Sequence, residues 1–283
     1  MPKDYYELLK PGIIYGNAIT AAGAFMLASG GRPDPGLLLA MLAGLSLVIG
    51  SGCAFNNYLD RDIDARMERT RSRALVRGSI PLRSALIYAG AAGVGGLALL
   101  YAFVNVRAAS VALLGFILYV FVYTLWGKRR TLYGTHVGAL SGAVPPVVGY
   151  VAVANRFDLG ALILFLILFF WQMPHFFAIA IRRAEDYRAA RIPALPLVRS
   201  SQETRLQIRV YIVAFLLAAI SLWYAGFASR TYAVIAGILG LSWFVSSCLP
   251  ATDERAWAAR VFFLSLIVLT LLSVAWMLSP VTP

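Results

Sequence analysis

The densest polar segment of the chain, NNYLDRDID at residues 56–64, directly follows a long apolar stretch. If a helix continues through it, Asn56, Asp60 and Asp64 lie on one face, about 6 Å apart per step along the axis, and Asp62 points to the opposite side. Two carboxylates and a carboxamide supply the oxygen ligands that Mg²⁺ prefers, and Mg²⁺ shares its remaining positions with phosphate oxygens. This spacing predicts a magnesium and phosphate site.

The simpler interpretation of this segment is a charged helix end on a solvated surface. Two observations favour the metal site. Carboxylates four residues apart on a helix repel each other, and Asn56 lies inside the apolar stretch, where a polar group without a partner is costly. A divalent ion would resolve both problems.

Basic residues follow this cluster in ARMERTRSR at 65–73 and at Arg77. Arg66, Arg69, Arg73 and Arg77 could each bind phosphate oxygens through forked hydrogen bonds. Basic residues also anchor the cytoplasmic end of a helix that crosses a membrane, and this role explains any one of them about as well. We predict that Arg69 and Arg73 act as the pair that binds phosphate.

A second polar cluster comes in three pieces: WQMPHFF at 171–177, RRAEDY at 182–187 and IPALP at 192–196. Asp186 is the predicted partner of Asp60 and Asp64, and Glu185 is a candidate second carboxylate. Like the first cluster, it follows the end of an apolar stretch. The two clusters are therefore expected to meet around one cavity.

His175 lies eleven residues before Asp186, about 16 Å away along a continuous helix, and would face the same cavity deeper in the membrane. A histidine inside a membrane span is a functional candidate by default. The alternative is a histidine bonded to a backbone carbonyl beside a proline kink. We favour a functional role for His175 and a structural one for His136, whereas Trp171 and Gln172 either line the cavity or pack.

These clusters are set in a very apolar chain: 60% of its 283 residues are hydrophobic and 13% are charged, whereas soluble domains carry about 25% charged residues. This composition excludes an ordinary soluble globule and a disordered chain. Two cysteines in apolar runs exclude a disulfide scaffold. Nine stretches are long enough to cross a bilayer as helices. They lie near residues 12–29, 36–56, 85–104, 108–126, 134–153, 160–181, 209–227, 231–249 and 261–279.

The net charge of +12 has a topological explanation. Nine spans divide the connections into two sets, and 21 of the 25 Lys and Arg residues fall in or beside the set that contains the N-terminus and the loops near 57–84 and 182–208. The positive-inside rule places this set in the cytoplasm and the C-terminus outside. We therefore predict no nucleic-acid partner.

Together these motifs resemble a known family. The spacing of Asn56, Asp60 and Asp64, with the later acidic cluster, resembles the two metal–diphosphate motifs of the intramembrane, UbiA-type prenyltransferase superfamily. A closer likeness is to the heme O synthase family, also called protoheme IX farnesyltransferases, and runs from KPG at 10–12 to DERAWAAR at 253–260. The segments that carry it are NNYLDRDIDARMERTRSRAL, YTLWGKRR, SGAVPPVVGY, WQMPHFFAIAI and EDYRAARIPALPLV.

The resemblance implies an all-α polytopic membrane protein, one prenyltransferase domain over residues 1–283, with nine transmembrane helices around a central cavity in a bacterial plasma (inner) membrane. It implies farnesyl transfer from farnesyl diphosphate to a vinyl group of heme b, giving heme O, with Mg²⁺ as cofactor. A heme A synthase or a heme-copper oxidase would use the product. Carried over by position, Asn56, Asp60 and Asp64 are ligands in the first metal motif, and Asp186 belongs to the second.

Two positions depart from the family pattern. Arg182 stands four residues before Asp186, where many superfamily members place a carboxylate. The second metal site is then poorer in carboxylate, or Arg182 contacts diphosphate directly. Arg191 stands where we expect glycine in many relatives.

The mechanism we expect is alkylation driven by ionisation of the diphosphate. Mg²⁺ held by the three aspartates neutralises the leaving group, and Arg69, Arg73 or Lys128 supplies further positive charge as the C–O bond breaks. His175 would ligate the heme iron or orient the ring, and heme propionates would favour cytoplasmic Arg or Lys. The small-residue runs AAGVGG and GALSGA predict close helix packing, or a slot for the farnesyl tail.

Two alternatives remain at this point. A related prenyltransferase that acts on a small aromatic, such as a hydroxybenzoate or a quinone precursor, would keep the aspartate motifs, although the MPHFF segment argues against it. In a transporter or other non-enzymatic membrane protein, the acidic loops would be ordinary solvent-exposed surface. The few charges inside the predicted spans make an ion pathway a poorer explanation.

Overall fold

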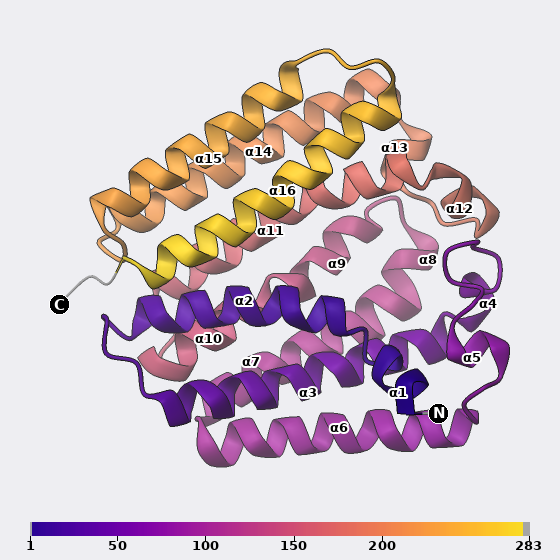
Figure 1. Cartoon of the computed structure of the whole chain (residues 1–283), viewed down its shortest axis with the longest axis horizontal. Coiled ribbons are helices and arrows are strands. Elements are labelled where there is room, and N and C mark those ends of the chain that lie inside the picture. Colours follow the sequence, from indigo (N-terminus) through magenta and orange to yellow (C-terminus); the bar gives the residue numbers. More distant parts are fainter. Residues whose placement is uncertain (1, 280–283) are drawn as a thin grey trace.

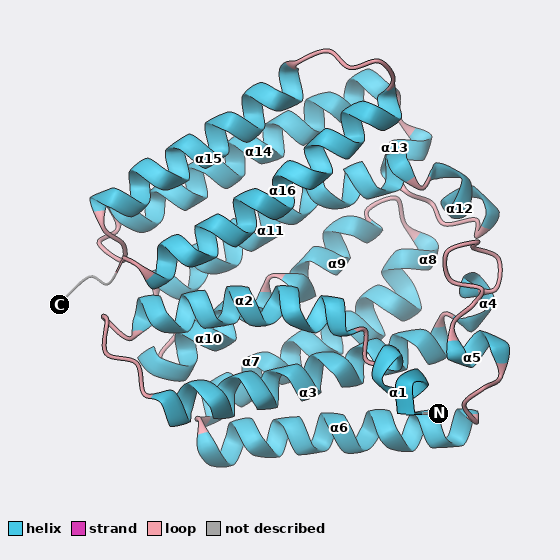
Figure 2. Ribbon diagram, in the orientation of Figure 1, coloured by secondary structure: helices cyan, strands magenta, loops and turns pink. Residues whose placement is uncertain are grey.

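The computed structural model describes residues 2–279, and every regular element in that range is helical (Figure 2). Nine helical segments in this range are long and apolar enough to cross a membrane, which confirms the predicted fold class. They are α2 (Pro11–Ala28), α3 (Pro35–Leu59), α6 (Leu82–Phe103), α7 (Val106–Ile117) continued by the π-helix η1 (Leu118–Gly127) and α8 (Lys128–Arg130), α9 (Gly134–Gly142) with α10 (Val144–Ala154), α11 (Leu159–Arg182), α14 (Ser201–Tyr224), α15 (Arg230–Cys248) and α16 (Glu254–Met277).

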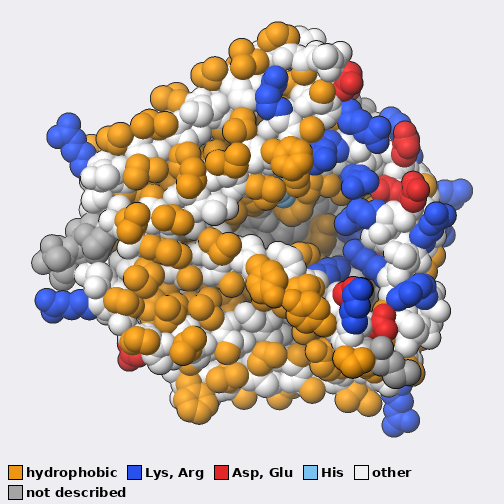
Figure 3. All heavy atoms as spheres, viewed as in Figure 1, with side chains coloured by type: hydrophobic (Ala, Val, Ile, Leu, Met, Phe, Trp, Pro, Cys, Tyr) orange, Lys and Arg blue, Asp and Glu red, His pale blue; other side chains and the backbone are white. Residues whose placement is uncertain are grey.

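Shorter helices gather at one end of this bundle (Figure 1). They are α1 (Pro2–Leu8), α4 (Arg61–Asp64), α5 (Ala74–Arg77), α12 (Ala184–Ala189) and α13 (Leu195–Val198). Most of the Lys, Arg, Asp and Glu side chains visible in Figure 3 lie at the same end, while the flank is mostly hydrophobic. The two polar clusters of the sequence therefore meet at one end of an apolar body, which we call the basic end.

Two spans begin earlier than hydropathy predicted. α14 begins at Ser201 rather than near 209, and α16 begins at Glu254 rather than near 261. In each helix the preceding side chain, Ser200 or Asp253, accepts a hydrogen bond from a backbone N–H of the first turn. Such caps start a helix in polar sequence, which a search for apolar residues alone does not detect.

The helices form an inner group around a cavity and an outer group that covers it. α6 packs along α3, while α14 and α15 pack outside α11 and α16. Small residues let these helices approach closely: α6 crosses α3 at Gly96 and Gly44, and α2 meets α10 at Gly149. Close packing, the expected role of the AAGVGG run, is thus confirmed at Gly96.

Two neighbouring glycines of α6 provide a test of this packing. A Cβ atom on Gly96 would lie 2.7 Å from the carbonyl oxygen of Gly44, whereas a Cβ on Gly95 would meet nothing within 4 Å. We expect Gly96→Ala to destabilise the protein by about 1–3 kcal/mol because the helices must separate. Gly95→Ala is the matched control, and thermal unfolding in detergent is the measurement. Equal melting temperatures for the two variants would contradict this packing.

Candidate active site

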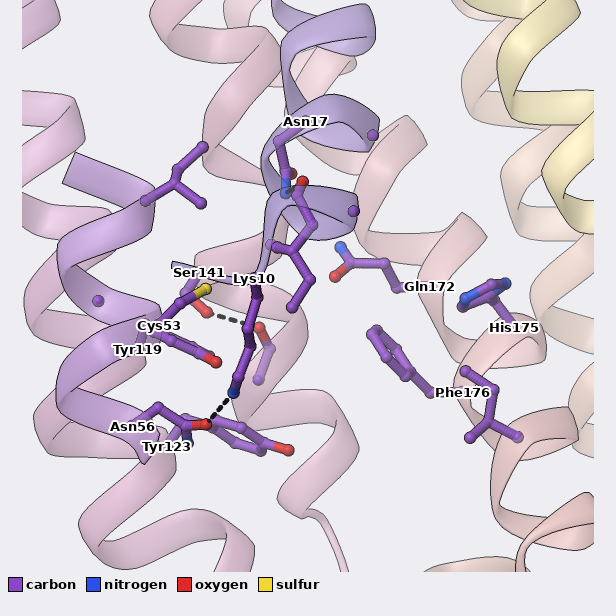
Figure 4. A pocket seen from close by; sticks show the side chains of 18 of the residues that line it. Lys10, Asn17, Cys53, Asn56, Tyr119, Tyr123, Ser141, Gln172, His175 and Phe176 are labelled. Atoms are coloured by element: carbon purple, nitrogen blue, oxygen red, sulfur yellow. Dashed lines mark hydrogen bonds between the residues drawn. The ribbon is translucent and has the colours of Figure 1, made fainter. Parts of the chain in front are cut away.

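A cavity of about 890 Å³ occupies the centre of the bundle and extends to the basic end. Side chains from α2, α3, α7, η1, α9, α10, α11 and α16 line it. Figure 3 shows its opening as a hollow in the hydrophobic flank between α2 and α16. Its two sides differ in chemistry, and Figure 4 shows Lys10 and Asn56 on one side of the space and His175 on the other.

One side, which we call the polar wall, consists of Lys10, Asn56, Asp64, Arg73 and Lys128. The other, which we call the aromatic wall, consists of Trp171, His175 and Arg182 of α11 and Phe262 of α16. The GALSGA run contributes Gly138, Ser141 and Gly142 to the lining.

Asp60 lies directly behind the polar wall and is fully buried. Lys128 Nζ donates to its Oδ2 at 2.6 Å, and Arg129 Nη2 donates to its Oδ1 at 3.2 Å. Asn56 Nδ2 donates to the same Oδ2 at 2.8 Å and to Thr124 Oγ1 at 3.0 Å. Two cations and an amide therefore balance a carboxylate that would otherwise be very costly to bury.

The expected continuous helix is interrupted at Asp60. α3 ends at Leu59, Asp60 has non-helical dihedral angles, and α4 begins at Arg61. The interruption is small, because the backbone N–H of Asp64 still bonds to the carbonyl of Asp60 at 2.7 Å. The contact between Asn56 and Asp60 bears out the shared face predicted for these two residues.

Asp64, 2% exposed, forms its own ion pair. Arg73 Nη1 donates to its Oδ2 at 2.5 Å, and both residues line the cavity together with Arg69. Asp62 is exposed, as expected, and pairs with Arg129 at 2.8 Å. The Arg129 hydrogen bond lowers the pKa of the Asp62 carboxyl, so this residue belongs to the surface that supports the site.

Asp186 connects the second cluster to the first without lining the cavity. Its Oδ1 accepts a hydrogen bond from the backbone N–H of Glu68 at 3.0 Å. Within residues 2–279 no three His, Cys, Asp or Glu side chains lie close enough to hold one metal ion. The predicted grouping of Asp60, Asp64 and Asp186 is therefore not assembled here, because Asp60 and Asp64 each pair with a cation of the chain and Asp186 pairs with backbone.

Lys10 is a polar-wall residue that sequence analysis did not single out. It has a left-handed backbone, with φ 54°, immediately before α2, and its Nζ donates to Asn56 Oδ1 at 2.6 Å (Figure 4). Burial lowers the pKa of its ammonium group to about 8. The feature of the sequence that could have identified Lys10 as a site residue is its position directly before Pro11 and an apolar span. Tyr119 and Tyr123 of η1 also line the cavity and were missed.

His175 projects from the aromatic wall (Figure 4). Its ring stacks between those of Trp171 and Phe262, with centroids 4.6 and 4.9 Å away, and is 8% exposed. Its Nδ1 lies 2.7 Å from the hydroxyl of Ser265, and that hydroxyl donates to the Phe262 carbonyl. A serine hydroxyl has one hydrogen, so its oxygen accepts a hydrogen bond from Nδ1–H, and a neutral ring then carries its lone pair on Nε2.

The remaining candidate side chains of the sequence analysis differ in whether they line the cavity. Trp171 and Gln172 both line the cavity, and Trp171 Nε1 donates to the Ser265 carbonyl at 2.8 Å. His136 lies outside the lining and bonds to the Tyr211 hydroxyl at 2.8 Å, in accord with the structural role predicted for it. Glu185 is exposed and does not line the cavity.

Sequence comparison decides the family. The UbiA prenyltransferase family matches residues 17–279. The chain belongs to this family. It is thus a membrane-embedded prenyltransferase, which removes the transporter alternative. Curated relatives named protoheme IX farnesyltransferase include one from Pectobacterium atrosepticum, 48% identical over 100% of this chain and 97% of the relative, and one from Yersinia pseudotuberculosis, 49% identical over 97% and 94%.

Solved structures show the same fold for this prenyltransferase. A structure described as digeranylgeranylglyceryl phosphate synthase aligns with a TM-score of 0.80 at 18% identity, covering 99% of this chain and 98% of that one. A UbiA homologue from Archaeoglobus fulgidus, bound to GPP and Mg²⁺, aligns with a TM-score of 0.68 at 14% identity, covering 97% and 99%.

Arg191 stands where the sequence analysis expected glycine, and its backbone explains that expectation. The residue has a left-handed conformation, with φ 54°, between α12 and α13. Glycine adopts that region at little cost, whereas other residues are strained there. The glycine expected at this position is therefore explained by the turn and not by chemistry.

Arg129 tests the charge balance around Asp60. Arg129→Gln removes a cation from Asp60 and Asp62 and a donor from the Leu59 carbonyl, and we expect a loss of about 1–3 kcal/mol in stability. Arg130→Gln, at an exposed neighbour with no ion pair among the described residues, is the matched control. Thermal unfolding in detergent measures both. Equal effects of the two substitutions would refute the proposed balance.

Proposed function

We propose that this prenyltransferase transfers the farnesyl group of farnesyl diphosphate to a vinyl group of heme b, giving heme O. The observation that carries the proposal is the pairing of two unlike walls in one cavity: a wall of cations and carboxylates suited to diphosphate, and an aromatic wall that contains a histidine bonded through Nδ1 to Ser265. The names of the relatives at 48–49% identity support the same reaction.

Diphosphate binds at the polar wall in this proposal. Lys128 and Arg73 each use one N–H on a carboxylate, and a lysine has three donors and an arginine five. Their remaining donors, with those of Arg69 and Lys10, are available to phosphate oxygens. The carboxylates hold these cations in place before substrate arrives, which is the preorganisation that electrostatic catalysis requires.

The oxygen donors in and directly behind the polar wall are of the chemical kind that Mg²⁺ prefers. Asn56, Asp60 and Asp64 are oxygen donors that are at most 4% exposed, and hard divalent ions prefer oxygen. In the structure Asp60 and Asp64 are paired with Lys128 and Arg73 and Asp186 accepts from backbone, so these three residues, with Asp186, would hold the ion only after exchanging those partners for it. Bound Mg²⁺ would neutralise the diphosphate leaving group.

The charges at the site determine the order of the steps in the proposed farnesyl transfer. The bond between farnesyl C1 and oxygen breaks, and its electron pair leaves on the diphosphate, where Lys128, Arg69 and Arg73 stabilise the negative charge. The heme vinyl group donates its π electrons to the allylic cation and forms the new C–C bond. Water adds to the resulting cation and releases a proton, which leaves a hydroxyl group on the product.

The farnesyl chain requires an apolar path out of the polar wall. Ile13, Ile49, Leu266 and Leu269 line the cavity, which opens on the hydrophobic flank between α2 and α16 (Figure 3). A fifteen-carbon tail can follow this path toward lipid. The apolar lining also keeps water from the allylic cation until the vinyl group has reacted.

Heme binds at the aromatic wall in this proposal, with His175 Nε2 toward the iron. Imidazole nitrogen is a common iron ligand, and a hydrogen bond at the other ring nitrogen is the usual way to fix the tautomer and ring orientation of such a histidine. Trp171 and Phe262 stack on the ring and hold it in place.

We further propose that the protein lies in a bacterial plasma (inner) membrane with the basic end in the cytoplasm and the C-terminus outside. The segregation of 21 of 25 basic residues supports this orientation. Both substrates would then be drawn from the cytoplasmic leaflet. A heme A synthase or heme-copper oxidase in the same membrane would use heme O.

Substitutions of the aspartates test the proposed role of the polar wall in farnesyl transfer. Asp60→Asn or Asp64→Asn should reduce farnesyl transfer to heme b by about a hundredfold or more, since the anchor of the catalytic cations and the Mg²⁺ ligand are both lost. Asp62→Asn, at an exposed residue on the other side, should retain activity within about twofold. The measurement is heme O formation by variants with wild-type melting temperatures. Full activity of Asp60→Asn and Asp64→Asn would overturn the assignment.

The two histidines test the aromatic wall. His175→Ala should weaken heme b binding by about tenfold or more and shift the heme absorption bands, because an axial ligand is removed. His136→Ala, outside the cavity lining, should change neither. Spectrophotometric titration of each variant with heme b measures both quantities. An unaltered affinity and spectrum in His175→Ala would remove its role as a ligand.

A further inference from the structure

One arginine of the aromatic wall and two arginines beside it lack carboxylate partners of the kind found at the polar wall. Arg182, Arg183 and Arg255 line a second hollow of about 390 Å³ that shares Arg182 and Arg183 with the main cavity. No ion pair joins any of the three to a carboxylate within residues 2–279. Asp253, the one acidic residue in the hollow's described lining, caps α16 by accepting from the backbone N–H of Ala256 at 2.6 Å. Positive charge therefore remains here for an anion.

The distance between Arg182 and His175 indicates which class of anion would bind here. Both residues line the cavity from α11, seven residues apart, which is two turns and about 10 Å along one face. Phe262 contacts both: its ring stacks on His175 with centroids 4.9 Å apart, and the Arg182 guanidinium lies 4.7 Å from its centroid. In heme, a comparable distance separates the central iron from the propionate carboxylates at the edge of the ring.

We propose that Arg182, supported by Arg183 and Arg255, binds the propionate carboxylates of the porphyrin acceptor while the iron faces His175. The inference rests on the heme-directed function proposed above, and it assigns Arg182 to the acceptor instead of the diphosphate. Guanidinium groups bind carboxylates through paired, charge-assisted hydrogen bonds. Stacking on Phe262 holds Arg182 in place before the porphyrin binds.

Two contacts, one at the iron and one at the propionates, would fix the position and the rotation of the porphyrin ring. The iron sets the distance of the ring from α11, and the propionates set its rotation about the iron. With the propionate edge held at the basic end, the vinyl-bearing edges face the rest of the cavity, where the allylic cation forms. Arg182 is thus a specificity-determining residue for porphyrins that carry free propionates.

The experiment compares heme b with its propionate dimethyl ester as acceptors for purified protein in detergent. Wild type should show a KM for the ester about ten- to a hundredfold above that for heme b, since charge-assisted hydrogen bonds are lost. Arg182→Gln should raise the KM for heme b by a similar factor, remove most of the discrimination against the ester, and leave the KM for farnesyl diphosphate unchanged. Arg182→Lys, which keeps the charge, should recover part of the discrimination.

Arg205→Gln is the matched control, because Arg205 stacks on Trp257 at 4.7 Å but does not line the cavity. It should keep the wild-type ratio of the two KM values. Equal wild-type KM values for heme b and the ester would overturn the inference without any variant. So would an Arg182→Gln variant that raises the KM for farnesyl diphosphate and keeps the discrimination. Absence of transfer from wild type to either porphyrin would instead refute the proposed function and, with it, this inference.

Discussion

The buried negative charge of Asp60 is the constraint on which the basic end of the molecule depends. A fully buried carboxylate at the end of a membrane helix is tolerated only when cations and hydrogen-bond donors surround it. Lys128 and Arg129 come from the far end of the fourth span, and Asn56 comes from the preceding turn of α3. Satisfying Asp60 therefore joins two spans at the point where the cavity reaches the basic end. Asp64 and Arg73 repeat the arrangement one turn further on.

This arrangement gives the cavity two different sides. The carboxylates hold cations on the polar wall, where a diphosphate would need them, while apolar and aromatic side chains of α11 and α16 form the other wall. The opening between α2 and α16 connects both walls to the membrane (Figure 3). Two substrates of opposite character, a charged diphosphate with a long tail and a flat aromatic ring, can then meet inside one membrane-embedded space.

Much of this could be predicted from sequence because membrane spans and charged loops obey simple rules. The nine spans, the all-helical class and the contact between Asn56 and Asp60 follow from hydropathy and helical spacing. What could not be predicted depends on long-range partners or polar caps. The pairing of Lys10 with Asn56 joins residues 46 positions apart, and α14 and α16 begin in polar sequence. The ion pairs of Asp60 and Asp64 are tertiary effects, because their cations come from other segments.

The most direct test of the account is the product made by purified wild-type protein in lipid vesicles. The vesicles would contain heme b and a hydroxybenzoate acceptor in equal amounts, with farnesyl diphosphate and Mg²⁺. Mass spectrometry should find heme that has gained one farnesyl group and the elements of water, and unchanged hydroxybenzoate. Prenylated hydroxybenzoate with unmodified heme would contradict the account.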